Sequence, residues 1–313
     1  MTLQQGVVCL VSILASTAYA QSTGVEKNAA KVVAFQQACD RGAMRDCTSL
    51  GMAYEIGSGV VKDPVKAAAL YRKACDGGAI LGCERLGGLY GVGSGVAQDA
   101  AKAISLHQKA CDGGEPEGCF SLGLHYEYGR GVAPDAAKAT TLYRTACDGG
   151  VALACVSLGS AYGRGVGVAE DAAKAAALYR KACDGGARFG CFSLAYQYDT
   201  GVGVARDAAA ATVLYGKACD GGEMRACQNL GVNYANGIGV ARDMSKAAAL
   251  YQKVCDGGGM LGCTSLGRLY AQGDGVTRDT AKAAALYRKA CDGGDARACS
   301  ALGVPTPKAP AKQ

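Results

Sequence analysis

Apolar and polar residues along the chain follow one pattern that repeats every 36 residues. In one period, the Ala-rich segment 66–75 carries Leu70 and Tyr71 on one side, as an amphipathic helix does. A second segment, 83–90, then places its Cys, Leu and Tyr residues at helical spacings. No segment alternates apolar and polar residues with the period of two that indicates a strand. The pattern therefore predicts an all-α fold in which every 36-residue unit is a pair of helices.

Residues that start and stop both helices recur in the same register. Asp63 followed by Pro64 is typical of an N-cap and a first helical residue. The two glycines at 77–78 predict a left-handed stop for the first helix, and the Gly-x-Gly motif at 93–95 ends the second. The Asp residues that open the later units are Asp99, Asp135, Asp171, Asp207, Asp243 and Asp279.

The chain has 17 Cys, and all but Cys9 form pairs eight residues apart. Along one straight helix, eight residues rise about 12 Å. A disulfide needs Cα atoms within about 7 Å, so a bridge within a pair requires a chain reversal, and the two glycines lie midway. We predict that each pair forms a disulfide joining the end of one helix to the first turn of the next. These pairs are Cys39 and Cys47, Cys75 and Cys83, Cys111 and Cys119, Cys147 and Cys155, Cys183 and Cys191, Cys219 and Cys227, Cys255 and Cys263, and Cys291 and Cys299.

The cysteine spacing does not suit metal or redox chemistry. Zinc sites use cysteines two to four residues apart, often with His, and redox sites use Cys-x-x-Cys. The chain has neither spacing, and its two His, His107 and His125, leave little room for a metal triad. We therefore predict no metal and no cofactor. The net charge of +6 is mild for 313 residues and predicts no nucleic-acid partner.

The two ends of the chain differ from the repeats. Residues 1–20 carry no charged side chain, contain an apolar run and end in Ala-Tyr-Ala, which predicts a signal peptide and a secreted or periplasmic protein. The run is too short for a stable membrane span after cleavage. Because the segment lacks Lys and Arg before its apolar run, a retained anchor or mitochondrial import stays an alternative. The repeat region is predicted over 21–304, and the Pro- and Lys-containing tail 305–313 is predicted to be disordered.

Four motifs in register, Leu-Gly-x-x-Tyr, Gly-x-Gly-Val, Asp-x-x-Lys-Ala and Tyr-x-Lys-Ala-Cys, resemble the Sel1-like repeat family, a relative of the tetratricopeptide repeats. The Cys pair in every unit is similar to the secreted cysteine-rich Hcp-type branch. The resemblance implies a right-handed α-α superhelix (solenoid) of disulfide-bridged helix hairpins. It also implies an adaptor that binds other proteins, although Hcp-type members are commonly described as penicillin-binding or β-lactamase-like. A eukaryotic relative belongs to the mitochondrial intermembrane space.

The chain lacks the motifs that a β-lactam hydrolase would need. Ser-x-x-Lys, Ser-Asp-Asn, Lys-Thr-Gly, His-Glu-x-x-His and Gly-x-Ser-x-Gly are all absent from the sequence. No catalytic residue can therefore be named, and enzymatic turnover rests on the resemblance alone. We predict an exported scaffold that binds a protein, a peptide or a cell-wall-derived ligand. A β-lactam-binding or β-lactam-hydrolysing enzyme and a mitochondrial assembly factor stay as alternatives.

Residues that depart from the repeat are the best candidates for specific binding, because the repeat itself explains the others. Most Tyr residues lie in two ladders, one running from Tyr54 to Tyr270 and the other from Tyr71 to Tyr287. Apart from Tyr19 in the predicted signal peptide, the aromatic residues outside the ladders all fall in the central units, together with variable polar residues. The candidate binding residues are Phe120, His125, Tyr128, Arg130, Arg188, Phe189, Phe192, Tyr196 and Gln197.

Several of these departures also have a purely structural interpretation. Phe120 and Phe192 each follow a second Cys and are expected to pack between neighbouring hairpins. His107 occupies a slot of the second Tyr ladder and is expected to be a packed substitute for Tyr. The recurring Lys and Arg residues of the first helix are expected to be solvated.

Overall fold

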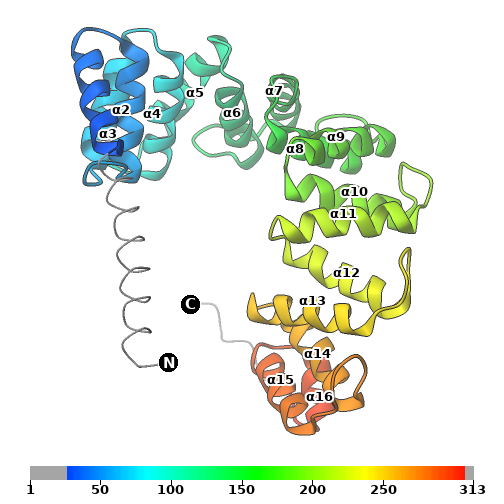
Figure 1. Cartoon of the computed structure of the whole chain (residues 1–313). Coiled ribbons are helices and arrows are strands. Elements are labelled where there is room, and N and C mark those ends of the chain that lie inside the picture. The colour runs from blue at the N-terminus through cyan, green and yellow to red at the C-terminus, as the bar shows by residue number, and fades with distance from the viewer. Residues whose placement is uncertain (1–26, 307–313) are drawn as a thin grey trace, which may run out of the picture. The chain divides into compact units, whose positions relative to one another are not determined.

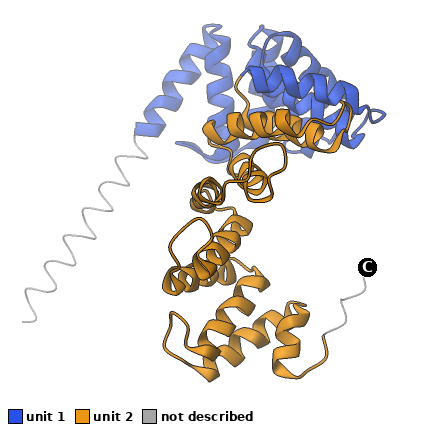
Figure 2. Cartoon of the chain, turned by 90° about the vertical axis from the view of Figure 1, so that its right-hand side faces the viewer, with its two compact units in different colours: residues 1–149 blue, residues 150–313 orange. Residues whose placement is uncertain are grey.

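The computed structural model describes residues 27–306, and in these residues every regular element is a helix (Figure 1). Residues 27–40 form the first helix. The chain divides into two compact units, Met1–Gly149 and Gly150–Gln313 (Figure 2). The later helices of the first unit are α2 (Met44–Ile56), α3 (Pro64–Asp76), α4 (Ile80–Val92), α5 (Ala100–Asp112), α6 (Pro116–Tyr128) and α7 (Ala136–Asp148).

The second unit continues the same helix order. Its helices are α8 (Ala152–Arg164), α9 (Ala172–Asp184), α10 (Arg188–Thr200), α11 (Ala208–Asp220), α12 (Met224–Asn236), α13 (Met244–Asp256), α14 (Met260–Gln272), α15 (Thr280–Asp292) and α16 (Ala296–Leu302). Within each unit, consecutive helices pack as hairpins, and α2 also contacts α4, α4 contacts α6 and α8 contacts α10. The prediction of an all-α fold built from helix hairpins is confirmed. The predicted signal peptide and the end of the tail lie outside the described residues.

Each odd-numbered helix from α3 to α15 begins with the predicted Asp cap. The Asp63 carboxylate accepts a hydrogen bond from the Lys66 backbone N–H at 3.0 Å, and Pro64 is the first helical residue. That backbone hydrogen bond lowers the pKa of Asp63 below its ordinary value, and the Lys66 ammonium, 3.5 Å away, adds to the effect. The same ammonium lies 5.3 Å from the centre of the Tyr54 ring. In most repeats, recurring Tyr, Asp and Lys residues therefore form one structural group that joins an even-numbered helix to the odd-numbered helix that follows.

The glycines that end the helices also allow close packing. In the pair at 77–78, it is Gly78 that adopts the left-handed conformation, with φ of +86°. In the Gly-x-Gly loops the second glycine contacts a helix one repeat earlier: a Cβ atom at Gly203, whose φ is +74°, would overlap the carbonyl oxygen of Ala172. These glycines thus stop a helix and also let the loop approach the start of the neighbouring helix.

The core between hairpins is made of Ala, Gly and the second Tyr ladder. Gly51 on α2 packs against the ring of Tyr71 on α3, and a Cβ atom there would lie 2.6 Å from the ring. The Tyr71 hydroxyl donates to Glu55 at 2.5 Å, and burial raises the pKa of Tyr71 well above its usual range. Ala67 and Ala74 are fully buried beside the ring. Small residues on one helix therefore create the space that the large ring of the next helix fills.

Within each unit, disulfides join the end of one helix to the start of the next helix, as predicted. Their Cα atoms lie 4.5–4.7 Å apart. The bridges with this geometry are Cys39–Cys47, Cys75–Cys83, Cys111–Cys119, Cys183–Cys191, Cys219–Cys227, Cys255–Cys263 and Cys291–Cys299. Cys147 and Cys155 are also disulfide-bonded.

The helix lysines are exposed, as expected, and several of them also make a defined contact. The Lys73 ammonium donates to the backbone carbonyl of Cys39 at 3.1 Å. Lys109 makes the same contact with Cys75 at 3.2 Å. These lysines satisfy a carbonyl at the C-terminal end of the helix one repeat earlier, where a positive charge also complements the helix dipole.

Candidate binding site

The repeats differ at one position near the end of each even-numbered helix, beside the ring of the second Tyr ladder. Where this residue is Glu, its carboxylate accepts a hydrogen bond from the Tyr hydroxyl: Tyr71 donates to Glu55 and Tyr143 donates to Glu127, both at 2.5 Å. Each of these Tyr residues is at most 2% exposed. Along the chain, this position holds Glu55, Gly91, Glu127, Gly163, Asp199, Ala235 and Ala271.

The two glycines at this position open a space that the glutamates close. A Cβ atom at Gly91 would meet nothing within 4 Å. At Gly163 the nearest atoms to such a Cβ would be the Ala175 Cβ atom at 3.8 Å and the Tyr179 hydroxyl at 4.0 Å. A pocket is present at each of these glycines, one in each unit.

We name the pocket of the second unit the Tyr196 pocket. It has a volume of about 310 Å³ and lies over α8, α9 and α10. Tyr196 is 54% exposed, and Tyr179 is half-buried although Tyr215 in the same ladder is fully buried. The residues that line the pocket are Ser160, Gly163, Arg164, Ala172, Tyr179, Phe192, Ser193, Tyr196, Gln197 and Val202.

The polar groups of the Tyr196 pocket are hydroxyl groups, which can donate or accept, one cation and one amide. Gln197 is 6% exposed; its side-chain amide donates to the Ala172 carbonyl at 3.4 Å, while its Oε1 atom is buried with no hydrogen-bond partner. Burial raises the pKa of Tyr179, and a hydrogen bond with the Ser160 side chain opposes the rise. Arg164 supplies a cation, and no acidic side chain lines the pocket.

We name the pocket of the first unit the His pocket. It has a volume of about 290 Å³ and lies over α4, α5 and α6. His107, which is 4% exposed, packs against Gly87 as the ladder Tyr residues pack against their own glycines. The expectation that His107 is a packed substitute for Tyr agrees with this contact. The lining residues are Gly88, Gly91, Val92, Gln98, Ala100, His107, Ser121, Leu124, His125, Arg130 and Gly131.

The two imidazoles of the His pocket form a hydrogen-bond chain. His125 Nδ1 lies 2.8 Å from the Arg130 carbonyl oxygen, so that nitrogen carries the proton and donates. His107 Nδ1 lies 3.3 Å from His125 Nε2 and donates to it when both rings are neutral. His107 Nε2 is then an unprotonated acceptor, buried without a hydrogen-bond partner. Burial, with a smaller effect from His125, lowers the pKa of His107 to about 4.

The buried imidazole predicts a loss of stability in mild acid. The folded-state pKa of His107, about 4, lies below the unfolded value of 6.5, so the unfolded chain binds the proton first. The free energy of unfolding should therefore fall by up to about 3 kcal/mol as the pH drops from 6.5 to 4. His107→Tyr, which restores the ladder residue, should remove this part of the loss in urea unfolding at pH 7 and pH 4.5. An equal loss in both proteins would contradict the assignment, since the other groups with shifted pKa values, including Glu84 and Glu115, are shared.

The structure places the predicted binding residues in both units. Phe120 lies 5.8 Å from Tyr143 and Phe192 lies 6.0 Å from Tyr215 between ring centres, in agreement with packing between hairpins.

Phe192, Tyr196 and Gln197 share the Tyr196 pocket, and His125 and Arg130 share the His pocket. Tyr128 is exposed with the Arg130 guanidinium 5.0 Å from its ring, while Arg188 lies 4.8 Å from the ring of Phe189 outside the Tyr196 pocket lining.

Gly91, Gly163, Arg164 and Tyr179 shape the two pockets, but the sequence did not single them out. The sequence does carry one sign of these pockets: a repeat position that is Glu at 55 and 127 is Gly at 91 and 163. This difference is visible only when each ladder Tyr is compared with the helix before it. Added aromatic residues stand out in the sequence, whereas these pockets arise from a missing side chain.

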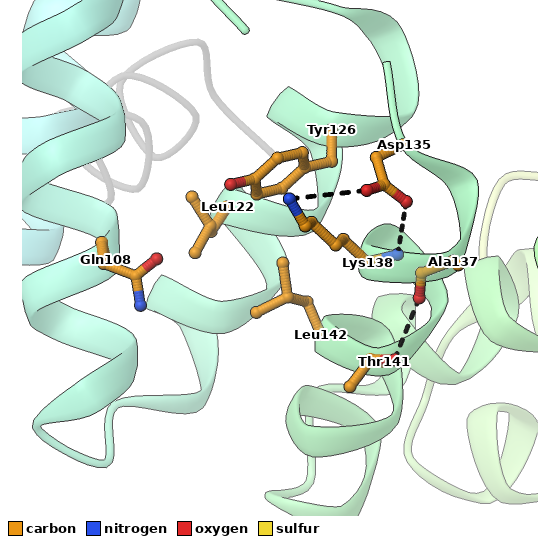
Figure 3. Close-up of a pocket in the computed structure, with 8 residues that line it drawn as sticks. All are labelled: Gln108, Leu122, Tyr126, Asp135, Ala137, Lys138, Thr141 and Leu142. Carbon is orange, nitrogen blue, oxygen red and sulfur yellow. Dashed lines mark hydrogen bonds and ion pairs between the residues drawn. The ribbon is translucent and has the colours of Figure 1, made fainter. Parts of the chain in front are cut away.

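A larger pocket of the first unit belongs to the repeat itself (Figure 3). It has a volume of about 480 Å³, and in the figure the Lys138 side chain reaches between Tyr126 and Asp135. A pocket at Tyr270, Asp279 and Lys282 in the second unit has the same three residue types. Because this group occurs in most repeats, it indicates architecture and does not mark a specific site.

The Sel1 repeat profile matches residues 47–78, 80–115, 116–151, 152–186, 189–223, 225–259 and 261–295. The chain belongs to the Sel1 repeat family. In this register each family repeat pairs an even-numbered helix with the odd-numbered helix that follows, so the disulfides join one Sel1 repeat to the next.

Solved structures of Sel1 repeat proteins are similar to this chain. A protective antigen of uropathogenic Escherichia coli, c5321, is 30% identical with a TM-score of 0.80, over 87% of this chain and 58% of that protein. This chain therefore matches little more than half of the antigen's length. A Sel1 repeat protein from Oxalobacter formigenes is 28% identical with a TM-score of 0.69, over 87% and 79% of the two chains. Helicobacter pylori cysteine-rich protein B is 33% identical with a TM-score of 0.35, over 42% of this chain and 93% of that one. No curated protein matches the chain.

Two further findings concern residues 27–306 alone. In this range no three His, Cys, Asp or Glu side chains are grouped so that they could hold a metal ion. None of its helices combines the length and the apolar character that crossing a membrane requires.

Proposed function

We propose that this Sel1 repeat protein is an exported scaffold that binds an extended segment of a partner protein in the Tyr196 pocket. The observation that carries the proposal is the pairing, in one pocket, of an exposed aromatic side chain with a buried acceptor that lacks a partner. Sel1 repeats are typical of protein-binding scaffolds, which supports a protein as the ligand.

The exposed and buried groups of the pocket suit a peptide. Tyr196 and Phe192 offer ring surface to an apolar side chain, and aromatic anchors carry much of the binding energy at protein interfaces. A buried acceptor without a partner costs roughly 1–3 kcal/mol, and a ligand N–H would recover that energy once the Gln197 side chain turns its Oε1 atom toward the pocket. A peptide main chain offers such an N–H at nearly every residue.

The cysteines support the proposed location. Disulfides persist in oxidising compartments, so this chain is suited to the periplasm or the outside of the cell. The signal peptide predicted over residues 1–20 provides the route. A tagged full-length chain should accumulate in the envelope or the medium of a bacterial host. The mitochondrial and β-lactam alternatives stay predictions, tested by tagged-protein location in a eukaryotic cell and by nitrocefin turnover.

Tyr196→Ala should weaken peptide binding without unfolding the protein. The probe is an arrayed library of random twelve-residue peptides with both ends blocked, screened against the oxidised full-length protein. We expect wild-type protein to bind a subset of peptides, and Tyr196→Ala to bind that subset about tenfold more weakly, as expected for loss of an aromatic anchor. The melting temperature should hardly change, because the side chain is largely exposed.

The matched control for this experiment is Val213→Ala. Val213 is 62% exposed on α11 and lines neither pocket. The Val213→Ala variant should bind the same peptides as wild-type protein does. Equal binding by the wild-type protein and Tyr196→Ala would show that the Tyr196 pocket does not carry the interaction.

A further inference from the structure

We propose that the Tyr196 pocket recognises a carboxylate, supplied by an internal glutamate of the bound segment, in the place where two other repeats have Glu55 and Glu127. The inference rests on the proposed function and adds the chemical class of the ligand group.

The other repeats show what the Tyr196 pocket lacks. On α2 and α6, a helix glutamate accepts a hydrogen bond from the ladder Tyr of the following helix, and that Tyr is buried. The same position on α8 is Gly163, so Tyr179 has no repeat glutamate to donate to and stays half-buried. The fold therefore keeps the donor half of the Glu–Tyr pair and leaves space for the carboxylate half.

The charges around this space suit a carboxylate. Tyr179, Ser160 and Ser193 bring hydroxyl groups, and Arg164 brings a guanidinium group. Because no acidic side chain lines the pocket, an incoming carboxylate meets no like charge there. The positive charge of Arg164 would strengthen the hydrogen bonds that this carboxylate accepts.

The main chain of the ligand has its own partner in the pocket. Gln197 Oε1 is a buried acceptor that would repel a carboxylate but accept a peptide N–H. Donors for a side-chain carboxylate and an acceptor for a main-chain N–H thus occur in one pocket of about 310 Å³. Together they fit a glutamate within a chain better than a small free acid.

The His pocket, which also lacks the repeat glutamate, should not share this preference at neutral pH. Its ladder residue is His107, whose pKa of about 4 keeps the ring neutral at pH 7. The unpartnered Nε2 atom of His107 is an acceptor, and an acceptor does not hold a carboxylate. A Gly at this repeat position is therefore not enough to bind a carboxylate. The Tyr179 hydroxyl and Arg164 give the Tyr196 pocket its specificity.

The first test uses the library peptides that bind wild-type protein and lose affinity for Tyr196→Ala. We expect these peptides to be enriched in an internal Glu, and replacement of that Glu with Gln to weaken binding about tenfold, as expected for a hydrogen bond to a charged group. A second library without acidic residues but with free carboxyl ends should bind no better than the Gln peptides. Tighter binding by that library would show that the carboxylate comes from a chain end and would overturn the glutamate assignment.

The second test fills the space from the protein side. Gly163→Glu gives Tyr179 the glutamate partner that Tyr71 and Tyr143 have, so it should keep or raise the melting temperature while weakening the binding of the Glu peptides about tenfold. Ala271→Glu adds the same charge at the same repeat position on α14, outside both pockets, and should bind as wild-type protein does. Tyr179→Phe keeps the ring and removes the hydroxyl. This variant should also bind the Glu peptides more weakly, while its affinity for the Gln peptides should not change.

The outcomes separate this inference from the proposed function. If Tyr196-dependent peptides bind Gly163→Glu as tightly as wild-type protein, or tolerate Glu→Gln, the carboxylate inference is wrong and the peptide-binding function stands. If no library peptide depends on Tyr196, both are wrong.

Discussion

Replacing Cys219 and Cys227 with Ala should lower the free energy of unfolding by about 3 kcal/mol. The bridge joins α11 to α12, and its sulfur atoms are buried among Ala218, Ala226 and Tyr215. Closing so short a loop restricts the unfolded chain by about 2.5 kcal/mol in the chain-entropy treatment, and lost packing adds to the cost. Urea unfolding of the full-length protein, followed by circular dichroism, measures the change.

Single variants supply the control for this bridge. Cys227→Ala alone breaks the same bond, so it should cost nearly as much as the double variant, and adding Cys219→Ala should change little further. Reducing the wild-type protein should destabilise it more than the double variant, because other bridges open as well. A double variant whose unfolding midpoint lies at the same urea concentration as that of the wild-type protein would contradict a stabilising role for the bridge.

Gly203→Ala should cost several kcal/mol, far more than the same change at Gly222. Both glycines have a left-handed backbone, with φ of +74° and +87°, so the conformational penalty for Ala, about 1 kcal/mol, is shared. They differ in their surroundings. A Cβ atom at Gly203 would overlap the Ala172 carbonyl group, while one at Gly222 would meet nothing within 4 Å.

The pair of glycine variants isolates the contact between neighbouring repeats. Gly203 lies in the loop after α10, and Ala172 begins α9, so the added methyl group should force the two apart. Melting temperatures of the two variants, measured side by side, test this expectation. Equal losses at both positions would show that the close approach of loop and helix contributes little to stability.

The helices and the disulfides could be predicted because the residues that determine them recur in sequence. Asp63 and Pro64 start α3 as predicted, since a cap acts on N–H groups only a few residues away. The start of α4 was less predictable: its N-cap residue, Ala79, makes no side-chain hydrogen bond, and the helix begins at Ile80, before the segment that the pattern indicated. Short-range hydrogen bonds leave a clear mark in sequence, and helix starts without them do not.

The pockets could not be predicted in the same way, because they depend on contacts between residues far apart in the chain. Gly163 opens a space beside Tyr179, and nothing in a single Gly residue indicates which ring it uncovers. His125 and Gln197 were grouped with surface aromatics as variable polar residues, yet both are buried. The contact of Lys73 with the Cys39 carbonyl spans 34 residues and follows only from the packing of one repeat on another.

The most direct test of the proposed binding scaffold is a crystal structure of the oxidised full-length protein with the tightest-binding library peptide. We expect the peptide in the Tyr196 pocket, with a main-chain N–H on Gln197 Oε1 and a side chain against Tyr196. A peptide bound elsewhere on the chain, with the Tyr196 pocket empty, would contradict the account.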